Sequence, residues 1–140
     1  EIMKTADIVI GLSTVKGLIK PTMVRPGQIV FALSNPDPEI APALAKEAGA
    51  VLAADGKGVN NILGFPGIWR GVADSRARRL NEQMLMAAAQ AIVLATEKGE
   101  LIPHPLNKKV HRDVAKAVAR AAMETGVAER QLDEDYFEAE

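Results

Sequence analysis

Three short apolar runs, each ending at small or polar residues, dominate the first half of the chain. They cover residues 6–12, 28–33 and 50–54 and are rich in branched and small apolar side chains. Runs of this length and composition are typical of strands buried in a parallel sheet. Pro21 suits a short helical turn before the second run, and Pro42 with Gly49 predicts a helix over residues 42–48 before the third.

Apolar residues in the second half recur instead at helical spacing. The recurring residues are Leu80, Met84, Ala87, Ala88, Ala91 and Ala95. They predict a long amphipathic helix that begins at a cap on Asp74 and ends at residues 98–99. A last helix is predicted from Asp113 to Gly126, after a stretch that holds two prolines. The acidic residues 133–140 predict a frayed tail or a linker.

The alternation of strands and connecting segments predicts an α/β fold with a parallel sheet. Crossovers between parallel strands are right-handed and bring the carboxyl ends of the strands to one edge, where such sheets bind ligands. Three polar segments follow the predicted strands, namely residues 11–14, 34–36 and 55–61. We therefore expect these segments to converge in space.

Composition limits the classes of protein that need to be considered. The 140 residues are 48% hydrophobic, which is enough for one domain or part of one. A net charge of −1 gives no general reason to expect nucleic acid or an anionic membrane as partner. The chain has no cysteine, signal-peptide pattern or membrane-length apolar run, so we expect a soluble, cytoplasmic protein. Because it starts without an initiator Met and directly at a strand-like segment, we also expect a fragment of a longer protein.

Residues 59–68 join the two halves and hold the paired amides Asn60 and Asn61. Gly64, Pro66 and Gly67 follow them and predict a tight bend held by apolar neighbours. An arbitrary pair of asparagines is more often a turn than a binding site. The sequence around this pair favours a binding site.

Three blocks of sequence carry a resemblance to a known family. They are residues 29–40, which contain Ser34-Asn35-Pro36, residues 59–71, which contain the paired asparagines, and residues 115–128. In order and spacing the chain resembles the C-terminal part of the NAD(P)-binding domain of malic enzymes of the short bacterial and archaeal type. The resemblance implies the C-terminal part of a Rossmann-like parallel sheet with flanking helices. Residues 1–71 would form a strand-rich half, residues 72–132 the C-terminal helices and residues 133–140 an acidic tail.

The resemblance also implies a function. A malic enzyme oxidises malate with NAD or NADP, in the presence of Mg or Mn, and releases carbon dioxide to leave pyruvate. The full-length protein would be a homo-oligomer. The family's glycine-rich dinucleotide fingerprint, its catalytic tyrosine and lysine and its acidic metal ligands belong to sequence upstream of Glu1. No catalytic residue and no metal ligand is therefore assigned here, and we expect the chain alone to be inactive.

By motif match, the resemblance assigns binding roles to the asparagines. Asn35 would lie near the nicotinamide and the substrate, Asn61 would contact the malate carboxylate, and Asn60 would shape the loop or reach the cofactor ribose. An amide suits these roles because it donates and accepts hydrogen bonds without adding charge. Gly11 and Ser13 are weaker cofactor-binding candidates, since small residues at a strand end more often form only a turn.

Other polar residues are poorer candidates. His104 and His111 match no metal-ligand spacing, and a solvated helix face is the more common setting for a cluster such as Arg76, Arg78 and Arg79. The loop of residues 55–58 is shorter than the family pattern. Two alternatives stay open: a non-catalytic α/β module for assembly or regulation, and a related NAD(P)-dependent dehydrogenase of other specificity.

Overall fold

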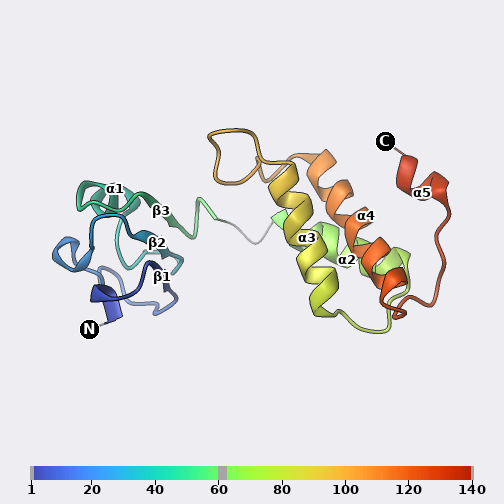
Figure 1. Cartoon of the computed structure of the whole chain (residues 1–140), viewed down its shortest axis with the longest axis horizontal. Helices are drawn as coiled ribbons and strands as arrows, with labels where there is room; N and C mark the ends of the chain where they lie inside the picture. Colours follow the sequence, from blue (N-terminus) through green and yellow to red (C-terminus); the bar gives the residue numbers. More distant parts are fainter. Residues whose placement is uncertain (1, 60–62, 140) are drawn as a thin grey trace. The chain divides into compact units, whose positions relative to one another are not determined.

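The computed structural model describes residues 2–59 and 63–139. The chain forms two compact units, Glu1–Asn60 and Asn61–Glu140. The first is drawn from blue to green and the second from green to red in Figure 1. Each unit has an apolar core of its own. The predicted strand-rich half, residues 1–71, therefore reaches into the helical unit. Among the described helices, none is long and apolar enough to cross a membrane.

A three-stranded parallel sheet forms the centre of the first unit. Its strands β1 (Ile8–Gly11), β2 (Ile29–Ala32) and β3 (Leu52–Asp55) lie side by side in chain order (Figure 1). The helical elements of this unit are η1 (Ile2–Lys4), η2 (Pro21–Met23) and α1 (Pro42–Glu47). The predicted strands and the α/β class are confirmed.

The two faces of this sheet differ in exposure. Val9, Val30 and Ala53 lie in register on one face and belong to or pack against the core of the unit. The buried residues of that core are Ile19, Val24, Val30, Ala32, Ile40, Ala45, Ala50 and Ala53. Side chains alternate between faces along a strand, and Ile8 and Ile10 of the other face are 56% and 60% exposed. The first unit thus presents an apolar sheet surface.

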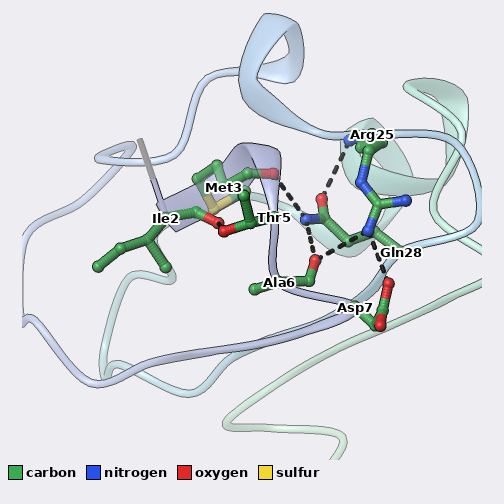
Figure 2. Close-up of polar contacts among 7 residues, drawn as sticks. All are labelled: Ile2, Met3, Thr5, Ala6, Asp7, Arg25 and Gln28. Carbon is green, nitrogen blue, oxygen red and sulfur yellow. Dashed lines mark hydrogen bonds and ion pairs between the residues drawn. The ribbon is translucent and has the colours of Figure 1, made fainter.

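Gln28 joins the N-terminal segment to β2 at the amino ends of the strands (Figure 2). Its fully buried amide donates from Nε2 to the carbonyl oxygens of Met3 (2.9 Å) and Ala6 (2.8 Å), and its Oε1 accepts from the backbone N–H of Arg25 (3.0 Å). Arg25 in turn donates from Nη2 to Ala6 O (3.2 Å) and to Asp7 Oδ1 (2.7 Å). Because a buried amide is costly without partners, these bonds fix the path of the chain into β1.

Helices make up the second unit. They are α2 (Phe65–Asp74), α3 (Glu82–Leu94), α4 (Lys108–Glu124) and α5 (Glu134–Glu138) (Figure 1). The buried core residues come mainly from α3 and α4 and include Met84, Val110, Val114 and Val118. The predicted apolar face of α3 is confirmed, because its recurring residues all lie in or against this core.

Two glycines let α2 approach α4 closely. A Cβ on Gly67 would lie 2.7 Å from the carbonyl oxygen of His111 and 2.7 Å from Val114 Cβ. A Cβ on Gly71 would lie 2.5 Å from the carbonyl oxygen of Ala115. Residues four apart share one face of a helix, so the two glycines form a single contact surface without side chains. Side chains at either position would push the helices apart.

The N-terminal helix boundaries of this unit differ from the prediction. The predicted bend at residues 64–67 contains the first turn of α2, where Pro66 fits because its missing N–H has no helical partner there. The long helix predicted from Asp74 is wrong. Asp74 ends α2, Arg76 takes a left-handed backbone (φ 48°) that breaks the helix, and α3 begins after Asn81, whose side chain accepts from the N–H of Met84 (3.0 Å).

The predicted start of the last helix is also wrong. Asn107 is the cap, since its side chain accepts from the backbone N–H of Lys109 (3.0 Å), and α4 begins at Lys108. Asp113 lies inside α4 and forms an ion pair with Nζ of Lys109 at 2.7 Å. Asn and Asp cap helices about equally well, so the residue type could not separate the two positions.

The predicted frayed tail instead contains α5, drawn in red in Figure 1. Asp133 caps this short helix by accepting from the N–H of Tyr136 (3.2 Å). The Tyr136 hydroxyl donates to Asp74 Oδ2 (2.7 Å), and the guanidinium of Arg120 lies 4.4 Å from the centre of the Phe137 ring. Burial and the hydrogen bond to Asp74 raise the pKa of the Tyr136 phenol, which therefore stays a donor.

Candidate functional site

Hydrogen bonds join the loops that follow β1 and β2. The N–H of Leu33 donates to the carbonyl oxygen of Gly11 (2.9 Å), and the N–H of Thr14 donates to Oγ of Ser34 (2.8 Å). Thr14 itself has a left-handed backbone, with φ of 60°. The predicted convergence of residues 11–14 with residues 34–36 is confirmed, as the polarity of parallel strands requires.

A buried carboxylate lies between these loops. Glu39 is fully buried, and its Oε1 accepts from the N–H (2.7 Å) and hydroxyl (2.8 Å) of Ser13 and from the hydroxyl of Ser34 (2.6 Å). Its Oε2 accepts a longer bond from the N–H of Ser34 (3.4 Å). A Cβ on Gly11 would lie 2.7 Å from the carboxyl carbon. A side chain at position 11 would therefore require the Glu39 carboxylate to shift.

Burial and hydrogen bonding act in opposite directions on the pKa of Glu39. Burial raises the pKa because it disfavours the charged form, whereas the bonds from Ser34 and Ser13 favour the carboxylate. The hydrogen bonds prevail and lower the pKa of Glu39 to about 2. The site therefore holds a fixed negative charge that is stabilised by dipoles.

The loop after β3 reaches the same edge at Asn35, an exposed residue. A Cβ on Gly56 would lie 2.8 Å from Nδ2 and 3.1 Å from Oδ1 of Asn35, and 2.7 Å from the carbonyl oxygen of Leu33. The peptide bond between Asn35 and Pro36 is cis. Within residues 2–59 and 63–139, the Asn35 amide forms no hydrogen bond. As an exposed residue, Asn35 places these polar atoms at the carboxyl ends of the strands.

The turn after β3 is closed by Asp55. Its Oδ1 accepts from the backbone N–H groups of Lys57 (3.1 Å) and Gly58 (2.8 Å), and its carbonyl oxygen accepts from the N–H of Val59 (2.9 Å). A carboxylate that bonds the following backbone is a common way to close a tight turn. The short loop of residues 55–58 is thus a compact turn in this chain.

The predicted site residues differ in where they lie and in what they contact. Gly11 and Ser13 lie at the strand edge, but both serve Glu39, one by making room and the other by donating two hydrogen bonds. Asn35 lies at the same edge beside Gly56. Asn60 and Asn61 lie outside the described residues. The binding roles of all five stay predictions.

The poorer candidates belong to the helical unit. Arg78 lies in the turn between α2 and α3, not on a helix face as predicted for the arginine cluster, and its Nη2 donates to the carbonyl oxygen of Gly126 (3.1 Å). His111 contacts the carbonyl oxygen of Pro105 through Nε2 (2.8 Å). In the described part of the chain, no three His, Asp or Glu side chains gather in a way that could hold a metal ion.

Glu39 is the site residue that the sequence did not reveal. Its partners Ser34 and Ser13 lie 5 and 26 positions away. A charged residue directly before the apolar Ile40, in the segment that follows β2, was the only local signal.

Parallel strands whose polar loops meet at one edge place the first unit among open α/β sheets, which bind ligands at the carboxyl ends of their strands. Comparison with known proteins identifies the family. The family model "Malic enzyme, NAD binding domain" matches residues 2–127. NAD-dependent malic enzyme 1 of Bacillus subtilis is 54% identical over 123 residues, and the NADP-dependent malic enzyme of Halomonas elongata is 37% identical over 164 residues. The chain belongs to the malic enzyme family.

Solved structures agree with this assignment. The crystal structure of malic enzyme from Pyrococcus horikoshii matches 96% of the chain with a TM-score of 0.86 and 42% sequence identity. The match covers 34% of that chain. The two sequence relatives are matched over 88% and 97% of this chain but over only 28% and 39% of their own lengths. The chain therefore spans about a third of the proteins it resembles.

Proposed function

We propose that the protein carrying this chain oxidatively decarboxylates malate to pyruvate and carbon dioxide while it reduces NAD or NADP. Membership of the malic enzyme family carries this proposal. The relatives are named as NAD-dependent and NADP-dependent enzymes, so both cofactors are candidates. The ligand would meet this chain at the edge formed by residues 11–14, 34–36 and 55–58.

Asn35 is proposed to bind both the nicotinamide and the substrate. Its exposed amide lies against Gly56 at the carboxyl ends of the strands, and it forms no hydrogen bond to another described residue, which supports this role. A neutral amide can orient a carboxylate or a carboxamide without changing the charge of the site. When bound, NAD(P) would accept a hydride from C2 of malate.

Three further roles are part of the same proposal. Asn61 would donate to the malate carboxylate, and Asn60 would shape the loop or reach the cofactor ribose. Gly11 and Ser13 would contribute to cofactor binding through backbone at the carboxyl end of β1. The sequence contains no G-x-G-x-x-G, so the pyrophosphate is assigned to residues outside this chain.

The divalent metal, Mg or Mn, is also assigned to residues outside this chain. Neither ion would find enough ligands here, because residues 2–59 and 63–139 hold no cluster of three acidic or histidine side chains. Among the described residues, Glu39 is the one buried carboxylate at the carboxyl ends of the strands, and its oxygens already accept four hydrogen bonds from Ser13 and Ser34. This chain would therefore contribute substrate and cofactor contacts but no metal ligand.

The test is an assay of malate-dependent NAD(P) reduction with Mg²⁺ or Mn²⁺. We expect turnover by the full-length protein and none by the 140-residue chain. A full-length protein without turnover would contradict the proposed activity, and turnover by the chain alone would contradict its inactivity. A screen of other 2-hydroxy acids separates malic enzyme from a related dehydrogenase, while a protein that binds no nucleotide would favour a module for assembly or regulation.

We further propose that the full-length protein is a cytoplasmic homo-oligomer. Helix α3 supports assembly, because it exposes apolar side chains beside its polar residues Glu82, Gln83 and Gln90; the apolar ones are Leu85, Met86, Val93 and Leu94. Exposed apolar side chains that gather on one element mark interaction surfaces. Light scattering of the full-length protein tests the oligomer, and cell fractionation tests the location.

A further inference from the structure

Glu39 connects three separate segments at the carboxyl ends of the strands. Its carboxylate accepts hydrogen bonds from Ser13 after β1 and from Ser34 after β2. Its own carbonyl oxygen accepts from the N–H of Ile19 (3.1 Å), and the carbonyl oxygen of Pro38 accepts from the N–H of Gly17 (3.2 Å). The turn that carries Glu39 is therefore bonded to the returning loop as well.

The carboxylate also sets the direction of the hydrogen bonds beyond it. Because Glu39 is acceptor-only when ionised, the Ser34 hydroxyl must give its proton to Oε1. Its lone pairs are then available to the N–H of Thr14, which donates to Ser34 Oγ at 2.8 Å. A left-handed residue such as Thr14 needs support of this kind, since its backbone conformation is unfavourable by itself.

Among the described residues, no countercharge forms an ion pair with Glu39. The four ion pairs there, such as Lys16 with Asp37, do not include it. A buried carboxylate that is held by backbone and hydroxyl dipoles needs each of its donors, because a lost donor leaves a charge unsatisfied. The carboxylate therefore ties Ser13 and Ser34 to fixed partners at the carboxyl ends of β1 and β2.

We propose that Glu39 is a positioning residue for this edge: it fixes the loops of residues 13–14 and 34–35 so that the Asn35 amide meets the substrate and the nicotinamide. The inference rests on the proposed function. Glu39 touches no ligand in this proposal and acts only through Ser13 and Ser34. A residue that holds a binding group within a fraction of an ångström can change the rate greatly, because small misplacements weaken binding in the transition state.

The test compares Glu39→Gln and Ser34→Ala in the full-length protein. Glu39→Gln keeps the shape of the side chain but turns an amide donor towards Ser34 or Ser13. Ser34→Ala keeps Glu39 and removes the hydroxyl between it and Thr14, so it serves as a second test if the first variant fails to fold. We expect kcat/KM for malate to fall by about 10-fold or more in each variant, measured well below its melting temperature.

The matched control is Gln28→Leu. Gln28 is as fully buried as Glu39 and forms three hydrogen bonds through its side chain, but it lies at the amino ends of the strands. We expect this variant to lower the melting temperature while kcat/KM stays within about twofold, as for other changes remote from a site. Hydrogen exchange should become faster at residues 13–14 only in the Glu39 and Ser34 variants.

The outcomes separate the two proposals. An active wild type whose kcat/KM is unchanged in Glu39→Gln and Ser34→Ala overturns the positioning role and leaves the proposed function intact. Equal kinetic losses in these variants and in Gln28→Leu also overturn it, because they would reflect general instability. A wild type that neither turns over malate nor binds malate or NAD(P) overturns both proposals.

Discussion

The side-chain amide of Asn35 lies directly against the backbone of Gly56. A Cβ on Gly56 would come within 2.8 Å of Nδ2 and 3.1 Å of Oδ1. The loop after β3 thus contacts the Asn35 amide, which we propose binds the ligand. A side chain at position 56 would therefore displace this amide or the backbone beside it.

Gly56→Ala should lower kcat/KM for malate in the full-length protein. The added methyl group would meet the Asn35 amide and the carbonyl oxygen of Leu33, so the amide must move. Gly58→Ala is the matched control, since its Cβ would be 3.5 Å from Asp55 Oδ1, an ordinary contact. Steady-state kinetics of both variants test this, and equal effects would argue against the Asn35 contact.

Substitution of the asparagines by alanine should separate binding from folding. Asn61→Ala is expected to remove one or two hydrogen bonds to a charged substrate group, at about 1.5–3 kcal/mol each, and so to lower kcat/KM for malate at least about 10-fold. Asn35→Ala should weaken both malate and cofactor binding. Asn60→Ala should change cofactor affinity or stability more than malate kinetics.

The control for these variants is the melting temperature of each protein. Replacing a residue that binds the ligand should leave the melting temperature almost unchanged. Replacing a residue that stabilises a turn should lower it. Unchanged kinetics with a lowered melting temperature for Asn61→Ala would leave the paired amides as turn residues.

Gly67→Ala should destabilise the contact between α2 and α4. Its methyl group would overlap with the carbonyl oxygen of His111 and with Val114, and overpacking of this kind costs about 1–3 kcal/mol. In Gly64→Ala the nearest atom is the mobile end of the Ile68 side chain at 3.3 Å, so a smaller loss is expected. Urea denaturation, monitored by far-UV circular dichroism, gives the free energy of unfolding of both variants. An equal loss of stability in the two would show that the close approach is unimportant.

The sheet could be predicted from sequence because its signals are local. Apolar runs of strand length, separated by prolines and glycines, were enough to place β1, β2 and β3 and the edge at which their loops meet. Helix α2 was missed for a physical reason. Gly67 and Gly71 look like helix breakers, and the α4 backbone that requires them lies more than 40 residues further along the chain.

The site was predicted only in part for the same reason. The strand polarity brought Gly11, Ser13 and Asn35 to one edge, but it gave no sign that a carboxylate would lie beneath them. Ser13 and Gly11 were interpreted as possible cofactor contacts, while their described contacts are to Glu39. A network whose members are distant in sequence becomes visible only in the folded chain.

Glu39 should make stability depend on pH in the acidic range. Its pKa is lowered from an ordinary value of 4.5 to about 2, so the unfolded chain binds the proton more readily than the folded one. The stabilisation is complete above pH 4.5 and is lost as the pH falls towards 2. The difference corresponds to on the order of 3 kcal/mol at neutral pH.

Urea denaturation between pH 2 and pH 7 tests this dependence. Glu39→Gln removes the titrating group, so the difference in free energy of unfolding between wild type and variant should shrink as the pH falls from 4.5 to 2. Asp37→Asn is the control, because the exposed Asp37 pairs only with exposed Lys16 and such pairs contribute little. A difference that is constant with pH would contradict the lowered pKa.

The isolated 140-residue chain should associate in solution. Ile8 and Ile10 are 56% and 60% exposed on one face of the sheet, whereas parallel strands are normally covered on both faces. Ile8→Thr together with Ile10→Thr should reduce association, because it makes that face polar and keeps β-branched residues that suit a strand. Ile2→Thr is the matched control, since Ile2 is 76% exposed but lies in η1 outside the sheet. Light scattering across a range of concentrations measures the mass, and a wild-type chain that stays monomeric and melts cooperatively would show that the exposed face does not drive association.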